Sequence, residues 1–200
     1  MALVIEDGTL PGGSPPPNSY VSVAQFQAFY EARGDTTLAE ADDTQVEAGL
    51  IKATDYMAQR LRLLWKGSRV TAFQPLDWPR SGVDVPDFFD PFYRNVNVPV
   101  AFQDTVFVGT DVIPQEIKDG QIFLAAATFD SNGLSSVSDL QATLARLTSK
   151  EKVGSLEVEY FGADQASDGG RQTAFYYNAM KRMEAFTLAS APHTGMVLRS

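Results

Sequence analysis

Residues 76–83, LDWPRSGV, bring together the side chains that first suggest chemistry. Arg80 could clamp an anion, because a guanidinium presents a planar fork of donors to a carboxylate or a phosphate. Ser81 and Gly82 are similar to a turn that carries a nucleophile. A serine becomes a nucleophile only beside a general base. The other chemistry-bearing residues of the chain therefore decide whether this loop is catalytic.

The single histidine, His193, lies in a polar segment near the C-terminus. A Ser-His-Asp triad would have to use it, and its imidazole must be held to a fraction of an ångström. A tail is a poor support for such geometry. Carboxylate pairs such as Asp42–Asp43 lie where a helix start would place them anyway. We therefore expect no catalytic residue and no enzymatic activity.

Ligands for a metal ion are equally scarce. One histidine and no cysteine leave only carboxylates, which suit calcium or magnesium. Asp164 and Asp168 lie in GADQASDGG at 162–170, but no glutamate follows at the spacing of an EF-hand loop. Neither GxxxxGK[ST] nor GxGxxG occurs. We expect no metal, no cofactor and a solvated link at 162–170.

The charge balance argues against a tight grip on nucleic acid. The formal net charge is −9, with 16 basic and 25 acidic residues. Nucleic-acid binders draw much of their affinity from Lys and Arg that displace counterions from phosphates. The N-terminus has no basic region followed by an apolar run, and no stretch of about 18 apolar residues occurs. We expect a soluble protein without a membrane span.

Two amphipathic helices are predicted early in the chain. Ser22 and Gln25 form a capping box, Val21 and Phe26 stand at the staple positions, and Gly34 ends the first helix. The second helix is predicted from Asp42–Asp43 to about Gly67. Its buried stripe has the 3-or-4 spacing of Val46, Leu50, Ala53, Met57, Leu61 and Leu64, with Tyr56 off that stripe.

The rest of the chain divides into segments of different character. Residues 1–19 include a Pro/Gly/Ser tract and are expected to form a flexible N-terminal arm. A helical domain follows over 20–161, with a projecting β-hairpin inserted at about 84–112. Residues 162–200 are read as a linker plus a C-terminal helix and tail. Within the domain, a largely buried helix starts near Pro114, a short helix covers about 136–147, and VGSLEVEY forms a strand.

These elements define the expected fold class. The chain is predicted to be mainly α, a helical bundle of about four to five helices with a small β element and the projecting hairpin. Two antiparallel helices joined by a short loop form its start.

Aromatic residues supply the candidates for binding. Phe88, Phe89, Phe92 and Tyr93 alternate with aspartates and prolines instead of Lys or Arg, which favours core packing or a protein partner over base stacking. In LDWPRSGV, proline restricts the preceding Trp78, so a rigid corner is favoured, with an interface as the alternative. The candidate interface residues are Trp78, Arg80, Phe88, Phe89, Phe92, Tyr93, Tyr176, Tyr177, Met180 and Met183.

An ordered set of motifs resembles a phage family. YVSVAQFQAFYEARG, EAGLIKATDYM, WKGSRV, LDWPRSGV, IPQEIKDGQIFLA and KVGSLEVEY occur in the order found in small tailed-phage proteins. These proteins are labelled DnaT-like single-stranded-DNA-binding proteins and are related to head–tail connector (adaptor) proteins. The resemblance covers about residues 19–161. The N-terminal arm, the 84–112 insertion and the C-terminal helix and tail depart from it.

The resemblance implies two alternative functions. One is a structural virion protein, a ring of twelve-fold symmetry in the neck that joins the portal protein to the tail-side closure (stopper) protein. Such a ring is assembled in the host cytoplasm and lets DNA pass without specific binding. The other is a single-stranded-DNA-binding replication accessory protein. The acidic charge favours the connector, because single-strand binding needs a basic, aromatic groove.

Overall fold

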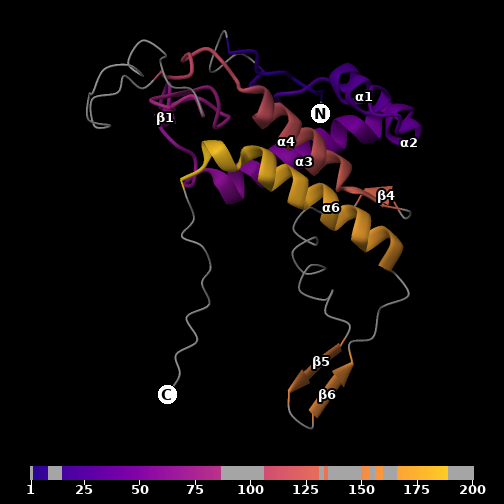
Figure 1. Cartoon of the computed structure of the whole chain (residues 1–200). Coiled ribbons are helices and arrows are strands. Elements are labelled where there is room, and N and C mark those ends of the chain that lie inside the picture. The colour runs from indigo at the N-terminus through magenta and orange to yellow at the C-terminus, as the bar shows by residue number, and fades with distance from the viewer. Residues whose placement is uncertain are drawn as a thin grey trace, which may run out of the picture.

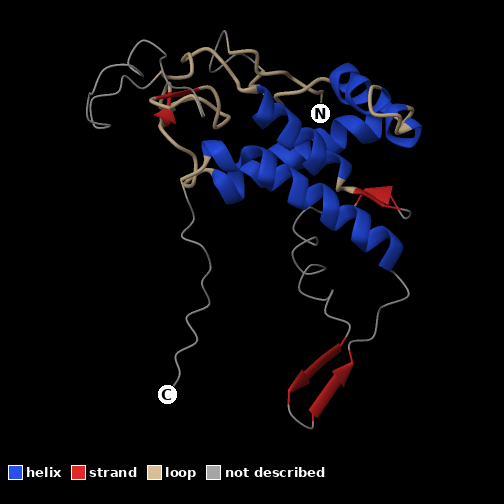
Figure 2. Ribbon diagram, in the orientation of Figure 1, coloured by secondary structure: helices blue, strands red, loops and turns tan. Residues whose placement is uncertain are grey.

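The computed structural model describes residues 2–8, 15–86, 106–130, 133–134, 150–153, 156–159 and 166–188 (Figure 1). The α-helices of this part are α1 (Val23–Glu31), α2 (Thr36–Ala39), α3 (Asp43–Leu61), α4 (Gln115–Ala126) and α6 (Ala166–Met183), and a 3-10 helix, η4, covers Glu184–Phe186. The strands are β1 (Ser68–Arg69), β2 (Arg80–Ser81), β3 (Phe129–Asp130), β4 (Gly133–Leu134), β5 (Lys150–Val153) and β6 (Leu156–Glu159). They pair in sequence order as three antiparallel two-stranded ladders. The fold is mainly α with a small β element, as predicted (Figure 2).

Helix α4 organises the core because it packs against both α3 and α6 (Figure 1). Its apolar face is buried, and Ile117, Leu124 and Ala125 are fully buried. Gly120 lets α6 approach closely, since a Cβ there would lie 2.6 Å from the Met183 side chain. The predicted burial of this helix is confirmed, although Pro114 occupies the N-cap and not the first turn.

Helix α1 begins where its capping box predicts. The Gln25 amide N–H donates to Ser22 Oγ at 3.2 Å, and the Ser22 amide N–H donates to Gln25 Oε1 at 2.9 Å. Val21 and Phe26 are both buried beside it. The chain then turns through Gly34, whose φ is 75°. The short helix α2, capped by Asp35, follows and was not predicted.

Helix α3 starts at the predicted acidic pair but ends earlier than predicted. Asp42 caps it by accepting from the Gln45 amide N–H at 3.2 Å. The helix stops at Leu61, so the prediction that it continues to Gly67 is wrong. Because the backbone turns after Leu61, Leu64 is exposed instead of buried.

Tyr56 was placed off the buried stripe of the second predicted helix, and the structure differs on this point. Its side chain is buried, and its hydroxyl donates to the Tyr176 hydroxyl at 3.0 Å. Burial first, and then the hydrogen bond to Tyr176, raise the pKa of Tyr56. The Tyr56 face of α3 is covered by α6, an element distant in sequence, and helix periodicity alone cannot show that.

The N-terminal residues lie against the body of the protein. Ile5 pairs with Ser19 in a parallel bridge, and the Glu6 amide N–H donates to the Ser19 carbonyl at 2.8 Å. The Asn18 amide N–H donates to the Val4 carbonyl at 2.9 Å. Residues 2–8 and 15–19 therefore do not extend as the free arm predicted for 1–19, because these backbone groups bond each other.

A buried glutamine joins three distant segments. Gln121 Oε1 accepts from the Tyr20 amide N–H at 3.0 Å. Gln121 Nε2 lies 2.8 Å from Ser19 Oγ, 2.8 Å from Thr54 Oγ1 and 3.0 Å from the Leu50 carbonyl. Since Gln121 is fully buried on α4, these bonds connect the N-terminal segment, α3 and α4 in one network.

Trp78 lies at a fully buried corner. Its ring meets Trp65 edge-on at 5.8 Å and Phe186 at 5.7 Å between ring centroids. The Trp78–Pro79 peptide bond is cis. Tyr20 Oη accepts from the amide N–H groups of Asp77 and Trp78, and burial raises the pKa of Tyr20.

Arg80 completes the corner by donating to three backbone carbonyls. Its Nε lies 2.8 Å from the Lys66 carbonyl, its Nη2 lies 2.8 Å from that of Gly67, and its Nη1 lies 3.3 Å from that of Asp77. Arg80 is buried, and desolvation lowers the pKa of its guanidinium. These bonds match the rigid-corner interpretation of LDWPRSGV.

Replacing Arg80 by lysine tests the importance of the three hydrogen bonds that its guanidinium donates. An ammonium group keeps the charge but cannot present planar donors to three carbonyls in different directions. We expect Arg80→Lys to lower the free energy of unfolding by about 1.5–3 kcal/mol, measured by urea denaturation. The exposed Arg182→Lys serves as the control and is expected to change it little. Equal effects of the two substitutions would contradict the corner role.

Gly67 and Gly82 both have a positive φ, but only at Gly67 would a Cβ meet other atoms. A Cβ on Gly67, whose φ is 64°, would lie 2.2 Å from the Ser81 carbonyl oxygen, whereas Gly82, with φ 70°, faces open space. We expect Gly82→Ala to cost about 1–2 kcal/mol through its left-handed backbone alone. Gly67→Ala should cost more because β1 and β2 must separate. Thermal unfolding of both variants gives the comparison, and equal losses would refute it.

Other predicted elements fall partly outside the described residues. Within the predicted 84–112 hairpin, the Val85 amide N–H donates to the Val106 carbonyl and the Val108 amide N–H to the Val83 carbonyl, both at 2.8 Å. The remainder of that hairpin and the short helix at 136–147 lie outside. The strand in VGSLEVEY is confirmed as β6. Helix α6 begins at Ala166, so the link predicted over 162–170 is wrong for its second half.

Candidate functional site

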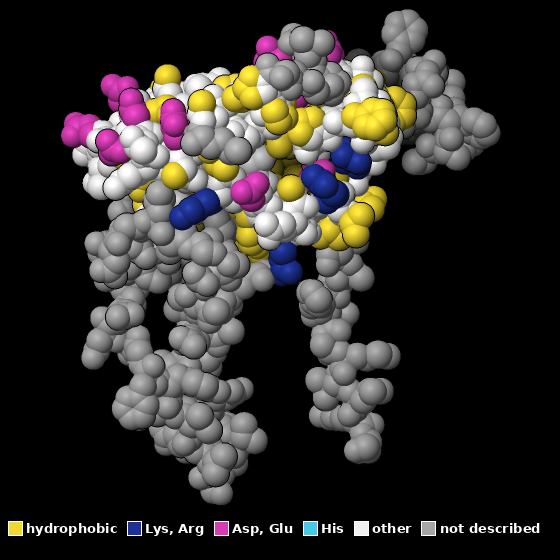
Figure 3. Space-filling model, turned by 180° about the vertical axis from the view of Figure 1, so that it is seen from behind, with side chains coloured by type: hydrophobic (Ala, Val, Ile, Leu, Met, Phe, Trp, Pro, Cys, Tyr) yellow, Lys and Arg dark blue, Asp and Glu magenta, His cyan; other side chains and the backbone are white. Residues whose placement is uncertain are grey.

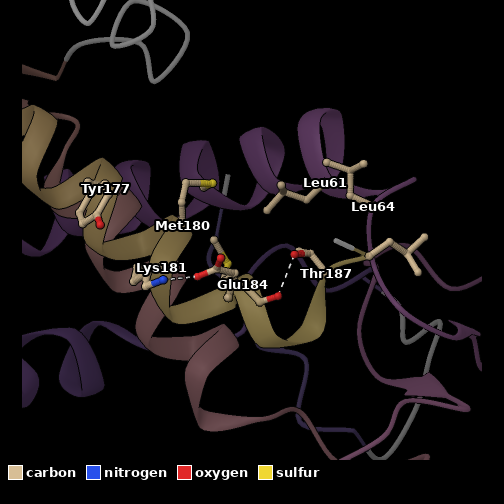
Figure 4. Close-up of a pocket in the computed structure, with 9 residues that line it drawn as sticks. Leu61, Leu64, Tyr177, Met180, Lys181, Glu184 and Thr187 are labelled. Carbon is tan, nitrogen blue, oxygen red and sulfur yellow. Dashed lines mark hydrogen bonds and ion pairs between the residues drawn. The ribbon is translucent and has the colours of Figure 1, made fainter. Parts of the chain in front are cut away.

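An open apolar groove of about 370 Å³ lies between the end of α3 and the end of α6 (Figure 4). Figure 4 shows Leu61, the last residue of α3, and Leu64 on one wall and side chains of α6 on the other. The lining residues are Leu61, Leu64, Tyr177, Met180, Lys181, Met183, Glu184, Thr187 and Leu188.

Backbone pairing fixes the two walls relative to each other. Trp65 and Thr187 form an antiparallel bridge. The Lys66 amide N–H donates to the Phe186 carbonyl at 2.9 Å, and the Leu188 amide N–H donates to the Leu64 carbonyl at 2.6 Å. The turn after α3 and the segment after η4 therefore form one continuous edge of the groove.

The groove has an apolar floor and a charged rim. Met183 is buried at the floor, whereas Leu64 and Leu188 are exposed. Lys181 Nζ lies 2.5 Å from Glu184 Oε2 at the rim, and this hydrogen bond raises the pKa of Lys181. Thioether side chains adapt their shape to an incoming apolar group, so the floor suits an apolar side chain of a partner.

Two large apolar side chains in the segment that follows α3 are left in solvent. Leu63, in the turn after α3, is 89% exposed, and Phe73, in the loop before Trp78, is 94% exposed. Figure 3 shows hydrophobic side chains gathered toward the side of the molecule that carries β1. We use the name groove-side surface for residues 60–73, which include Leu61 and Leu64 of the groove, together with residues 177–188. Exposed apolar surface of this kind is typical of interaction sites.

Three of the predicted interface residues meet in the groove. Tyr177, Met180 and Met183 all line it, because they lie on one side of α6. Tyr177 is 64% exposed, which leaves its ring available to a partner. Tyr176 instead turns toward Tyr56, and the two ring centroids are 6.0 Å apart.

The remaining predicted residues are not at the groove. Trp78 and Arg80 are buried in the corner, where each already contacts its own chain. Phe88, Phe89, Phe92 and Tyr93 lie outside the described residues.

Sequence reasoning missed several exposed apolar residues of the groove-side surface. Leu63 and Leu64 were taken as part of a longer helix, and Phe73 and Leu188 were given no role. The tandem leucine after Arg62 is the signal that was available, because only one residue of such a pair fits an apolar stripe.

Metal sites and membrane-spanning helices were also sought among the residues that the structure describes. Among the described residues, no group of three or more His, Asp or Glu side chains is placed to hold a metal ion. The helices of those residues are all too short or too polar to cross a membrane.

Comparison with known families gives one match. A family model described as "Putative DnaT-like ssDNA binding protein" matches residues 1–199. No curated protein and no solved structure matches the chain.

Proposed function

The chain belongs to this DnaT-like family, and on that premise we propose that it is a structural adaptor of a tailed-phage virion. In this proposal it forms a head–tail connector ring of about twelve copies in the neck. The ring binds the portal protein on one side and the tail-side closure (stopper) protein on the other, and DNA passes through it. Assembly takes place in the host cytoplasm. The motif order over residues 19–161 supports this proposal.

The observation that carries the adaptor role is the groove-side surface. Leu63 and Phe73, which follow α3 in the chain, are almost fully exposed, and an apolar groove lies at the end of α3. Aromatic and aliphatic side chains of this size stabilise protein contacts when a partner removes them from water. A protein that docks onto others through this surface accounts for their exposure.

Three basic side chains are already paired with carboxylates of the same chain, and this supports passage of DNA without adhesion. Arg62 pairs with Asp77 at 2.8 Å, Lys66 with Asp84 at 3.3 Å, and Lys181 with Glu184. Cations that already face carboxylates of their own chain gain less from phosphates. The net charge of −9 repels DNA further.

The decisive experiment is quantitative mass spectrometry of purified, DNA-filled particles. The measured quantity is the copy number of this chain relative to the portal protein. A ratio close to one is expected for a ring matched to the portal. Absence of the chain from particles would eliminate the connector proposal.

Single-stranded-DNA binding is the second candidate function, and the description of the family favours it. This function predicts binding to oligonucleotides that weakens steeply as salt rises, because bound phosphates release counterions. Fluorescence anisotropy with a labelled oligonucleotide measures this directly. No binding at low salt would rule this candidate out.

A further inference from the structure

The last described residue of the chain is itself part of the groove. Leu188 lines the groove, and its side chain is exposed. Leu64 and Tyr177, which Figure 4 shows on the two walls, are exposed as well. Among the described residues, none removes these three apolar side chains fully from water. The groove therefore has room for an apolar occupant.

Backbone pairing sets the direction in which the chain continues past Leu188. Trp65 and Thr187 form an antiparallel bridge. The Leu188 amide N–H then donates to the Leu64 carbonyl. In an antiparallel pair, each step forward on one strand lies opposite a step backward on the other. A continuation in this register runs back toward Leu61, which also lines the groove.

The segment that continues from this point carries suitable side chains. Residues 189–200 follow Leu188 and lie outside the described part of the chain. Their run of three large apolar side chains is Met196, Val197 and Leu198. The connection, 189–195, contains a proline and a glycine, residue types that favour a turn of the backbone.

The connection is long enough for the apolar run to return to the groove. Seven residues span at most about 23 Å when extended. The α6 wall of the groove extends from Tyr177 to Met183, a rise of about 9 Å along the helix. Closing a loop of this length costs little conformational entropy. The apolar run can therefore reach the whole length of the α6 wall.

The charges of the rim favour an uncharged occupant. Lys181 is already paired with Glu184 at the rim, so neither gains much from a charged ligand. Residues 189–198 contain no Asp, Glu, Lys or Arg. Met180 and Met183 supply thioether side chains, which adapt their shape to aliphatic groups. An uncharged aliphatic segment therefore suits this groove better than a charged one.

We infer that the occupant of the groove is the C-terminal segment of the same chain, with Met196, Val197 and Leu198 seated between the end of α3 and the end of α6. A ligand attached at the edge of its own site is present at an effective concentration in the millimolar range. Free segments of other molecules must compete with that concentration. A partner that uses the groove must first displace the C-terminal segment.

This inference goes beyond the proposed function and does not rest on it, because docking within one chain requires no second protein. The copy number of the chain in particles tests the connector alone. The test of the docked segment uses the purified full chain alone, so the two results are independent.

Two double variants of the full chain test the docking. Val197→Asp with Leu198→Asp places two charges in the apolar run and should release it from the groove. Ser190→Asp with Thr194→Asp adds the same two charges to the connection and is the matched control. Neither variant changes a described residue. The methyl resonance of Met57, which is buried in the core and does not line the groove, verifies that each variant is folded.

Methyl NMR of the five methionines provides the readout. In the wild-type chain we expect a nuclear Overhauser contact between the Met180 and Leu198 methyl groups. The Val197→Asp, Leu198→Asp variant should lose contacts to the C-terminal segment and shift the Met180 resonance, whereas the control should keep both.

Two outcomes would overturn the inference. The first is a Met180 resonance that is the same in the wild-type chain and in the Val197→Asp, Leu198→Asp variant, without a contact to Leu198. The second is a Met180 resonance that moves with protein concentration and ignores both double variants, because a second copy of the chain would then occupy the groove.

Discussion

Replacing Trp78 by alanine is expected to lower the free energy of unfolding by about 3–5 kcal/mol. The Trp78 ring is fully buried and contacts Trp65 and Phe186 edge-on. Its removal leaves a cavity between two segments that the rest of the core cannot fill without moving the corner. Urea denaturation measures the loss, and reduced soluble yield should accompany it.

Two further substitutions sharpen this prediction. The indole N–H of Trp78 has no hydrogen-bond partner in the described part of the chain, so Trp78→Phe keeps the ring contacts and should cost much less. Phe73→Ala removes an exposed aromatic ring of the same loop and should hardly change stability. Near-wild-type stability of Trp78→Ala, with failed assembly, would instead place the ring at an interface.

Replacing Gln121 by leucine is expected to lower the free energy of unfolding by about 1–3 kcal/mol. Leucine fills a similar volume but leaves the Tyr20 amide N–H without its acceptor, whereas the Ser19 and Thr54 hydroxyls keep their bonds to the Val21 and Leu50 carbonyls. Each buried polar group without a hydrogen bond costs about 1–3 kcal/mol. Guanidinium denaturation followed by tryptophan fluorescence gives the value.

The matched control for Gln121 is Gln45→Leu on α3, whose side chain is exposed. That substitution should leave stability almost unchanged. Hydrogen exchange adds a structural readout, since loss of the network should speed exchange of the Tyr20 amide first. A stable Gln121→Leu variant with a protected Tyr20 amide would show that the network contributes little.

Features set by neighbouring residues were predicted from the sequence. The capping box of Ser22 and Gln25 and the acidic start of α3 at Asp42 depend on groups within a few residues, and both were confirmed. The buried face of α4 was also predicted, because Ile117 and Leu124 share one face that Ile122, Phe123 and the alanines widen.

Features set by distant contacts were not predicted. The end of α3 at Leu61 coincides with backbone bonds from Leu64 and Lys66 to residues 186–188, which no local pattern reveals. The role of Gln121 depends on four groups from two other segments. The groove was anticipated only through Tyr177, Met180 and Met183, since its other wall is created by the turn after α3.

Because Phe186 packs against Trp78, the corner around Trp78 can pack fully only after the C-terminal segment has been synthesised. Trp65 and Trp78 leave the ribosome long before the segment that covers them, which follows about a hundred residues later along the chain. The side of the Trp78 ring that Phe186 covers therefore stays open on the nascent chain until η4 emerges. A chain stopped before Phe186 would present an open aromatic corner to chaperones and proteases. The segment after α6 is therefore the last part of this corner to pack.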